Sequence, residues 1–254
     1  MELWREQRTL ETMQIIFFDT ETTGNTEQDR LCQLAVKRRC EAEPVVNATY
    51  KPPVPISIES MAIHHITPKM VADRPLFVDA PEHLRLKELF EDKNTVSVAH
   101  NVTFDVTMLS REGIRPAHTI CTYKIASALD PEDIIPKYTL QYLRYYLDLE
   151  VAAGTVAHDA MGDVLVLEAL FERLLKKMME RIPDEEEALK EMIAISSRPL
   201  LFTTIRFGKY SGKRIEEVAE KDPKYLEWLL AQKKQDPDNE VDWIYTLEHF
   251  LARA

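Results

Sequence analysis

The sequence has few cysteines, no long apolar run and no surplus of positive charge. Its three cysteines (Cys32, Cys40 and Cys121) form no CxxC pair and are odd in number, so they indicate reduced thiols and not a disulfide framework or a zinc site. No apolar run approaches the roughly 18 residues that cross a membrane. The polar N-terminal residues show no apolar core of a secretory signal. We therefore expect a cytoplasmic protein with no membrane partner.

The charge balance limits how the chain could meet nucleic acid. A formal net charge of −11 argues against a protein that coats nucleic acid nonspecifically. It does not exclude a nuclease, because bound metal ions change the local field. A hydrophobic content of 45% and a charged content of 30% are typical of a globular protein. A length of 254 residues fits one large domain, or one medium and one small domain.

The most informative stretch is Ile15 to Gly24. Its first four residues are apolar and predict a buried strand, and Asp19 and Glu21 follow at the end of that strand. Side chains alternate along a strand, so both carboxylates should point to the same side. Two like charges held together cost stability unless a cation lies between them, and carboxylate oxygens suit Mg²⁺ or Mn²⁺. Because exposed acids at strand ends are common, this pair alone is a weak signal.

Two further acidic motifs strengthen it. His100-Asn-Val-Thr-Phe-Asp105 lies at a predicted junction of strand and helix, with Asp105 one turn into the helix. His158-Asp-Ala-Met-Gly-Asp163 opens the clearest predicted helix, and His158 must lie in the preceding loop to reach the same site as Asp163. A histidine on a loop can act as a mobile general base. Each motif alone also fits a helix-dipole acid or a surface histidine, but together they favour one site.

The remaining pattern predicts an α/β fold with a mixed sheet. Three strands come first, and strands and helices then alternate. We expect further strands over 31–40, 45–50, 95–99 and 119–121, and helices over 57–61, 81–90, 123–129, 139–147 and from about 159. Thr67-Pro68 resembles a helix cap with proline at the first helical position, which predicts one more short helix there.

The domain organisation follows from changes in composition. We expect an N-terminal extension over residues 1–13, a main domain over 14–182, a linker or helix over 183–195 and a small module over 196–254. Residues 196–234 hold nine Lys and Arg against five Asp and Glu, a net charge of +4. The module is therefore locally basic within an acidic protein.

The three acidic motifs together resemble the DEDDh family of 3′→5′ exonucleases. Relatives that carry a tyrosine would place it where Asp159 stands, so the histidine subtype fits. The likeness extends to Met61–Val71, Ile120–Thr122 and Arg198–Trp228, which resemble the exodeoxyribonuclease X branch of that family. It implies a ribonuclease H-like fold: a mixed five-stranded sheet flanked by helices, plus a small C-terminal α+β module. The activity it implies is 3′→5′ hydrolysis of DNA ends to 5′-mononucleotides in DNA repair.

The resemblance also implies roles for individual residues. Two Mg²⁺ ions, for which Mn²⁺ could substitute, would be held by four carboxylates: Asp19, Glu21, Asp105 and Asp163. His158 would take a proton from the attacking water. The terminal nucleotide would be contacted by Thr22 and Thr23 at its 3′-hydroxyl and by Ile63, His64 and Phe104 at its base. For Ile63 and Phe104, packing in the core is nearly as good an interpretation.

The basic module is a candidate for further DNA contacts. The candidate residues surround a glycine-containing turn: Arg206, Lys209, Tyr210, Lys213 and Arg214. The four cations would meet phosphates, and the tyrosine would stack on an unpaired base. For Tyr225 and Trp228, packing within the module is the favoured interpretation.

Two alternatives to a DNA exonuclease stay open at this point. An exoribonuclease would use the same motifs, because recognition of the 2′-hydroxyl depends on the shape of the pocket. A catalytically inactive nucleic-acid-binding scaffold would use the same fold. The presence of all four carboxylates and of His158 speaks against the scaffold.

Overall fold

The computed structural model describes residues 13–152, 158–237 and 240–253. The N-terminal extension predicted over residues 1–13 lies outside this range, apart from Met13. Among the described helices, none combines the length and the apolar character that a membrane span requires.

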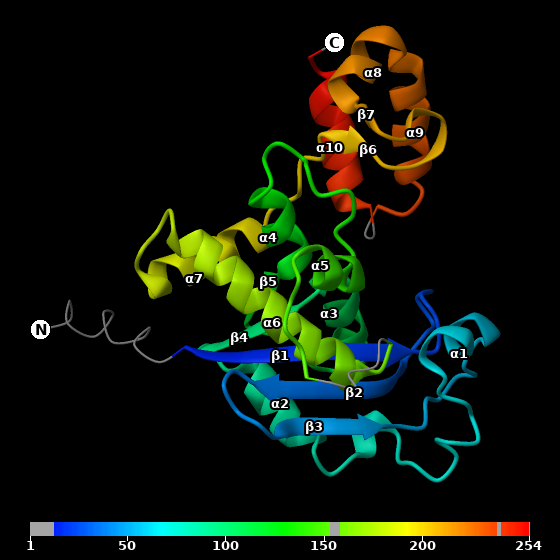
Figure 1. The fold of residues 1–254 in the computed structure, drawn as a ribbon. Helices are drawn as coiled ribbons and strands as arrows, with labels where there is room; N and C mark the ends of the chain where they lie inside the picture. Colours follow the sequence, from blue (N-terminus) through cyan, green and yellow to red (C-terminus); the bar gives the residue numbers. More distant parts are fainter. Residues whose placement is uncertain (1–12, 153–157, 238–239, 254) are drawn as a thin grey trace, which may run out of the picture.

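A five-stranded sheet forms the centre of the main domain (Figure 1). Its strands, in spatial order, are β3 (Pro44–Thr49), β2 (Leu31–Arg38), β1 (Gln14–Thr22), β4 (Thr95–Ala99) and β5 (His118–Cys121). β2 runs antiparallel to β1 and β3, whereas β1, β4 and β5 are parallel to one another. The predicted mixed sheet is thereby confirmed. The carboxyl ends of the three parallel strands meet at the same edge of the sheet, which is where side chains for a site can gather.

Helices cover both faces of this sheet. They are α1 (Ile58–His64), α2 (His83–Glu91), α3 (Val102–Arg111), α4 (Thr122–Ala128), α5 (Leu140–Tyr146), α6 (Ala160–Met179) and α7 (Glu185–Ser196), with a 3₁₀ turn at Phe77–Asp79. The long helix α6 crosses one face (Figure 1). The segment 183–195, predicted as a linker or a helix, is largely α7, and its Ala188, Leu189 and Met192 lie in the same core cluster as α6.

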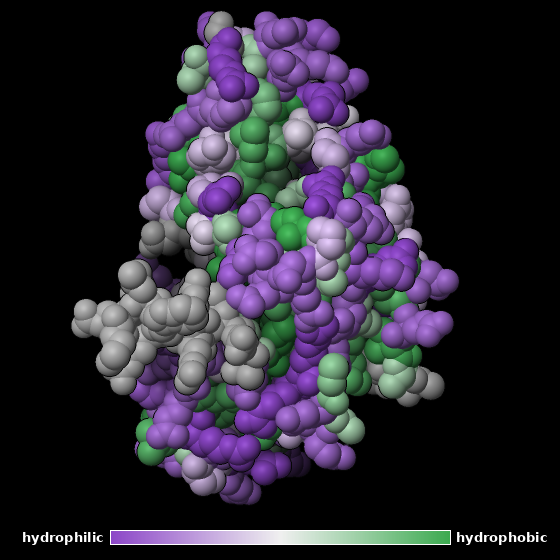
Figure 2. Space-filling view, turned by 90° about the vertical axis from the view of Figure 1, so that its left-hand side faces the viewer, coloured by the Kyte–Doolittle hydropathy of each residue, from purple (hydrophilic) through white to green (hydrophobic). Residues whose placement is uncertain are grey.

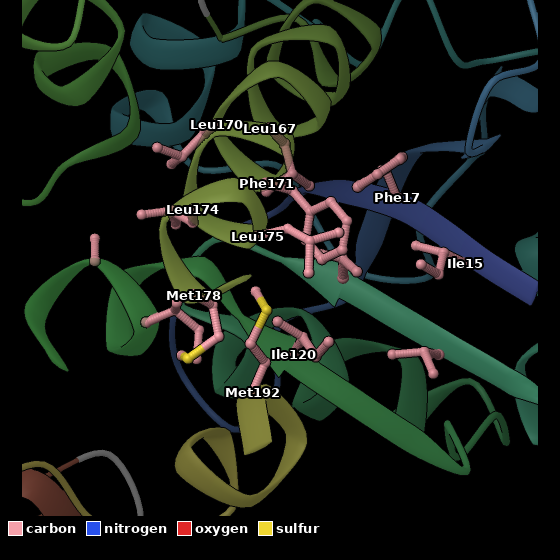
Figure 3. Packing of buried hydrophobic residues seen from close by; sticks show 14 of the residues in the cluster. Ile15, Phe17, Ile120, Leu167, Leu170, Phe171, Leu174, Leu175, Met178 and Met192 are labelled. Carbon is pink, nitrogen blue, oxygen red and sulfur yellow. The ribbon is translucent and has the colours of Figure 1, made fainter. Parts of the chain in front are cut away.

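Strand β1 divides the core into two halves, because its side chains alternate between the faces. Ile15 and Phe17 belong to the cluster under α6, and Ile16 and Phe18 to the cluster under α2 and α3. Figure 3 shows Phe17 directed toward Phe171 of α6, and the two ring centroids lie 5.3 Å apart in an edge-to-face contact. The same alternation continues to the end of the strand and decides where its polar residues point.

The ends of several helices match the capping signals of the sequence. Ser57 caps α1 by accepting a hydrogen bond from the Ser60 amide, and Asp159 caps α6 by accepting one from the Gly162 amide. The helix predicted after Thr67-Pro68 is wrong. That segment forms turns closed by isolated bonds, such as the Met70 amide to the Thr67 carbonyl. Pro75 disfavours helical geometry at the residue before it, so a helix that started at Pro68 would have to end within two turns.

The chain after α7 forms the C-terminal module, drawn in yellow to red in Figure 1. It contains β6 (Thr204–Ile205), a 3₁₀ turn (Gly208–Tyr210), β7 (Lys213–Arg214), α8 (Ile215–Lys221), α9 (Pro223–Lys233) and α10 (Val241–Leu251). A separate small core holds it together, with Ile205, Ile215 and Leu226 fully buried. Figure 2 shows apolar side chains on the upper part of the molecule, where this module lies, between hydrophilic ones.

The contact between Phe17 and Phe171 predicts that truncating either ring destabilises the main domain. Phe171→Ala should lower the free energy of unfolding by about 3–5 kcal/mol, because it leaves a cavity beneath α6. Tyr145→Ala is the matched control: its side chain is 75% exposed, so we expect a change within about 0.5 kcal/mol. Urea unfolding of both variants measures the difference, and equal losses would contradict the assignment of the core.

Candidate active site

Three carboxylates converge at the end of β1. Ligand atoms of Asp19, Glu21 and Asp163 all lie within 4.8 Å of one another. Asp19 and Glu21 are odd-numbered residues of β1, like Phe17. Their side chains therefore point to the face of the sheet that α6 covers. Asp163 lies in the first turn of α6, which crosses that face. The pairing of β1 with β2 shifts register between Glu21 and Thr22, so the regular strand ends where the site begins.

Asp105 reaches this region from the other face of the sheet. It is buried in the first turn of α3. One of its oxygens, Oδ1, accepts hydrogen bonds from the Thr20 amide at 3.1 Å and the Thr20 hydroxyl at 2.6 Å. Thr20, like Phe18, is an even-numbered residue of β1, so its side chain lies on the face of the sheet that α3 covers. Asp105 is therefore fixed to the strand that carries Asp19 and Glu21, but it is not one of the three carboxylates that share the closest approach.

Asp163 is held by two donors. The Gln141 side-chain amide donates to Oδ1 at 2.5 Å, and the His158 backbone amide donates to Oδ2 at 3.1 Å. Sequence reasoning missed Gln141. Its one signal was its place near the start of the helix predicted over 139–147, and nothing in the local pattern distinguishes it from a solvated polar residue. In the fold, Gln141 orients the carboxylate that α6 contributes.

His158 lies in the loop before α6, as its spacing from Asp163 requires. Its backbone adopts a left-handed conformation with φ of 61°, and its side chain is exposed. The same turn directs its amide to Asp163. The imidazole is therefore anchored through its backbone next to the carboxylates while the ring itself remains accessible to solvent.

The carboxylates resist ionisation in the absence of cations. Burial, followed by the charges of Asp105 and Glu21, raises the pKa of Asp19 well above its usual range. Burial and the neighbouring acids, Asp163 first, raise the pKa of Glu21 to about 8. Burial also raises the pKa of Asp105 to about 7, although its bonds from Thr20 act in the opposite direction, and it raises the pKa of Asp163. The site therefore favours partners that bring positive charge.

The donor set fits divalent cations. All the converging ligand atoms are carboxylate oxygens, which suit hard ions such as Mg²⁺, Mn²⁺ or Ca²⁺. A cation bound between Asp19, Glu21 and Asp163 would remove the mutual repulsion that raises their pKa values. In the described part of the chain, no lysine or arginine forms an ion pair with any of them.

A pocket of about 560 Å³ adjoins the carboxylates. Glu21, Thr22, Ile63 and Phe104 contribute to its lining, and the Ile63 side chain is 52% exposed. An exposed aliphatic side chain and a half-buried aromatic one beside an acidic site suit contact with a base better than they suit the core. Gly24 lines the same pocket, and a Cβ there would come within 2.6 Å of the Asp29 carboxylate. A larger residue there would displace the Asp29 carboxylate from its hydrogen bonds with Thr23 and Thr26.

Thr23 and His64 are held more tightly than their predicted roles require. Thr23 is fully buried, and its hydroxyl donates to the Asp29 carboxylate at 2.6 Å. His64 lines the pocket but is only 7% exposed. Its Nδ1 accepts from the Ile66 amide, so its Nε2 carries the proton and donates to the Thr22 carbonyl at 3.1 Å. Both residues shape the turn after β1, which favours a positioning role over direct contact with substrate.

The cations predicted to contact DNA from the module differ in how they are paired. Arg206 forms an ion pair with Asp133 of the main domain and donates to the Pro136 carbonyl, so it joins the two parts of the chain. Lys209 and Tyr210 both bond to Asp222 within the module. Lys213 and Arg214 are exposed on β7 and form no ion pair with any described residue. Of the predicted cations, these two remain open to a phosphate.

Comparisons with known proteins agree with this geometry. A family model described as Exonuclease matches residues 16–171. A second, described as Exodeoxyribonuclease X-like C-terminal, matches residues 205–234. The chain is 34% identical over 205 residues to Exodeoxyribonuclease 10 of Escherichia coli (strain K12), which covers 80% of this chain and 83% of the relative. It is 31% identical over 172 residues to a DNA polymerase III subunit epsilon of Treponema pallidum, covering 62% of this chain and 74% of the relative.

Solved structures show the same fold. Exonuclease X in complex with 5′ overhanging duplex DNA aligns with a TM-score of 0.56 and 29% identity over 72% of this chain and 99% of the other. Exonuclease I of E. coli in complex with a dT13 oligonucleotide aligns with a TM-score of 0.54 and 24% identity over 67% of this chain and 42% of the other. The chain belongs to the exonuclease family. Within that family it is a homologue of exodeoxyribonuclease X of the DEDDh type.

The raised pKa values predict an unusual pH dependence of stability in EDTA. The folded protein keeps protons that the unfolded chain would release between about pH 4.5 and pH 8, so its stability is present at low pH and is lost as the pH rises. Each such group lowers the free energy of unfolding by up to about 1.4 kcal/mol per pH unit. Asp19→Asn should reduce this loss and unfold at a higher temperature than the wild type at pH 8 in EDTA.

Asp73→Asn serves as the control, because Asp73 is exposed and far from the carboxylates in sequence. Thermal unfolding from pH 5 to pH 8, with EDTA or with Mg²⁺, measures the effect. Mg²⁺ should stabilise the wild type most at high pH. A wild-type stability that does not fall with pH in EDTA would contradict the proposed repulsion.

Proposed function

We propose that this protein is a Mg²⁺-dependent 3′→5′ exodeoxyribonuclease that releases 5′-mononucleotides from DNA ends and acts in DNA repair in the cytoplasm. The observation that carries the proposal is the convergence of Asp19, Glu21 and Asp163 beside an accessible histidine. The relatives support DNA as the substrate: one is named Exodeoxyribonuclease 10, and a solved relative is in complex with overhanging duplex DNA.

Each residue of the site would have a separate role in hydrolysis. Asp19, Glu21 and Asp163 would hold two divalent ions together with Asp105, and such ions supply Lewis acidity and offset charge on the scissile phosphate. Gln141 keeps Asp163 directed into the site. Ile63 and Phe104 would contact the terminal base, and Thr22 would lie beside the terminal sugar. His158 would accept a proton from the attacking water.

A digestion assay tests this function directly. Single-stranded DNA, duplex DNA and RNA of matched sequence, each labelled at the 5′ end, are incubated with Mg²⁺ or with EDTA. We expect a ladder that shortens from the 3′ end on DNA with Mg²⁺ and no products with EDTA. Faster digestion of RNA would identify an exoribonuclease, and intact substrates under all conditions would identify an inactive scaffold. Asp19→Asn should abolish cleavage, because it removes one of the carboxylates that would hold the ions.

The role of His158 gives a second test. His158→Ala should lower kcat by roughly 10²–10⁴-fold, the usual contribution of a general base. The dissociation constant for DNA should change far less, since the imidazole is proposed to move a proton and to hold neither metal nor substrate. His249→Ala, in α10 of the module, is the control. A kcat for His158→Ala near that of the control would assign the proton transfer to another group.

A further inference from the structure

A second pocket lies at the seam between the main domain and the C-terminal module. Its volume is about 350 Å³. The main domain contributes His100, Asn101, Tyr123, Thr139 and Leu140, and the module contributes Phe202, Glu240, Asp242 and Trp243. Three of these residues are aromatic and come from different segments: Tyr123 opens α4, Phe202 precedes β6 and Trp243 lies in α10. The pocket therefore exists only where the two parts of the chain meet.

This seam pocket lies at the same sheet edge as the carboxylates. Asn101 follows β4 and Tyr123 follows β5, and both strands run parallel to β1. The first turn of α3 separates the seam pocket from the pocket next to Glu21, because Asn101 lines the first and Phe104 lines the second. Leu140 of the seam pocket is the immediate neighbour of Gln141, which holds Asp163. A strand that ends at the carboxylates has the seam pocket beside it.

The charges of the seam do not repel a nucleic acid strand. Asp242 pairs with Lys124 at 3.1 Å, and Glu240 pairs with Lys233 at 2.6 Å. An adjoining groove of about 260 Å³ contains Lys124 and Arg198, and Arg198 forms no ion pair within the described residues. The acids of the pocket are thus neutralised locally, and a guanidinium remains at its outer side for a phosphate.

The surfaces inside the pocket suit a base. Trp243 is half-exposed, and its ring centroid lies 4.6 Å from that of Phe202. Asn101 and Thr139 are exposed, and in the described part of the chain no hydrogen bond uses either side chain. Aromatic faces with a few convergent polar groups are what an unpaired base requires, since every base has a face that stacks. The volume is in the range of small-ligand sites.

We propose that the seam pocket is a second nucleotide-binding site, which takes an unpaired base of the substrate strand upstream of the scissile nucleotide and stacks it on Trp243. The proposal rests on the proposed function, in that the strand is DNA. In this proposal the C-terminal module does not bind DNA mainly through lysine and arginine contacts to phosphates. It supplies one wall of a pocket for a nucleobase. Arg206 then acts as the tether that holds this wall in place through Asp133.

Abasic scanning with Trp243 variants tests the pocket. Oligonucleotides of eight thymidines, labelled at the 5′ end, carry one abasic residue at each position in turn, and fluorescence anisotropy measures their affinity in Ca²⁺. For the wild type we expect a weakening of about tenfold at one internal position, the loss of one stacked base. Trp243→Leu should bind the intact oligonucleotide about tenfold more weakly and show no further loss at that position. Trp243→Phe keeps an aromatic face, so an abasic residue at that position should again weaken binding.

The controls separate the possible failures. Trp228→Leu changes a tryptophan that is 54% exposed on α9 and does not line the pocket, and it should behave as the wild type. A general loosening of the module by Trp243→Leu would weaken binding but leave the positional loss intact, and that result overturns the proposal. So does a wild type with no internal position that matters. If the wild type binds and digests none of the intact oligonucleotide, the proposed function itself fails.

Discussion

The repulsion among buried carboxylates is the interaction on which the site depends. Asp19, Glu21 and Asp163 are brought within 4.8 Å of one another. Burial raises the pKa values of all three, and the charges of the neighbouring acids raise those of Asp19 and Glu21 further. Such an arrangement costs stability on its own, so the rest of the fold must hold it in place. The hydrophobic core on both faces of β1 and the hydrogen bonds to Asp105 and Asp163 supply that support.

The alternation of one strand distributes these supports. Odd-numbered residues of β1 face α6, so Phe17 packs against Phe171 and Asp19 meets Asp163 on the same side. Even-numbered residues face α3, so Phe18 lies in the second core cluster and Thr20 binds Asp105. Core and active site are therefore two parts of the same pattern. A shift of one residue in the register of β1 would exchange the two sets and destroy both.

This local rule explains which features the sequence could predict. Alternation and helical spacing lie within a few residues of chain, and they predicted the five strands, α6 and the gathering of the acidic motifs. Gln141 was missed because its partner, Asp163, is 22 residues away and no local pattern joins them. The pairing of Arg206 with the main domain was missed for the same reason. Arg206 has its partner 73 residues earlier, at Asp133, and no local pattern joins the two.

Positively charged side chains help to dock the C-terminal module onto the main domain. Arg206 and Lys124 each join the main domain to the module, the first through Asp133 and the second through Asp242 and the Arg198 carbonyl. Partly buried pairs of this kind add little net stability, because each charge loses its hydration, but breaking one leaves the other unpaired. Their main effect is orientation. Lys124 fixes α10 against α4, and Arg206 fixes the segment after β6 against the loop before α5, the helix whose Gln141 orients Asp163. The position of the module and the geometry of the carboxylates are therefore linked through one helix.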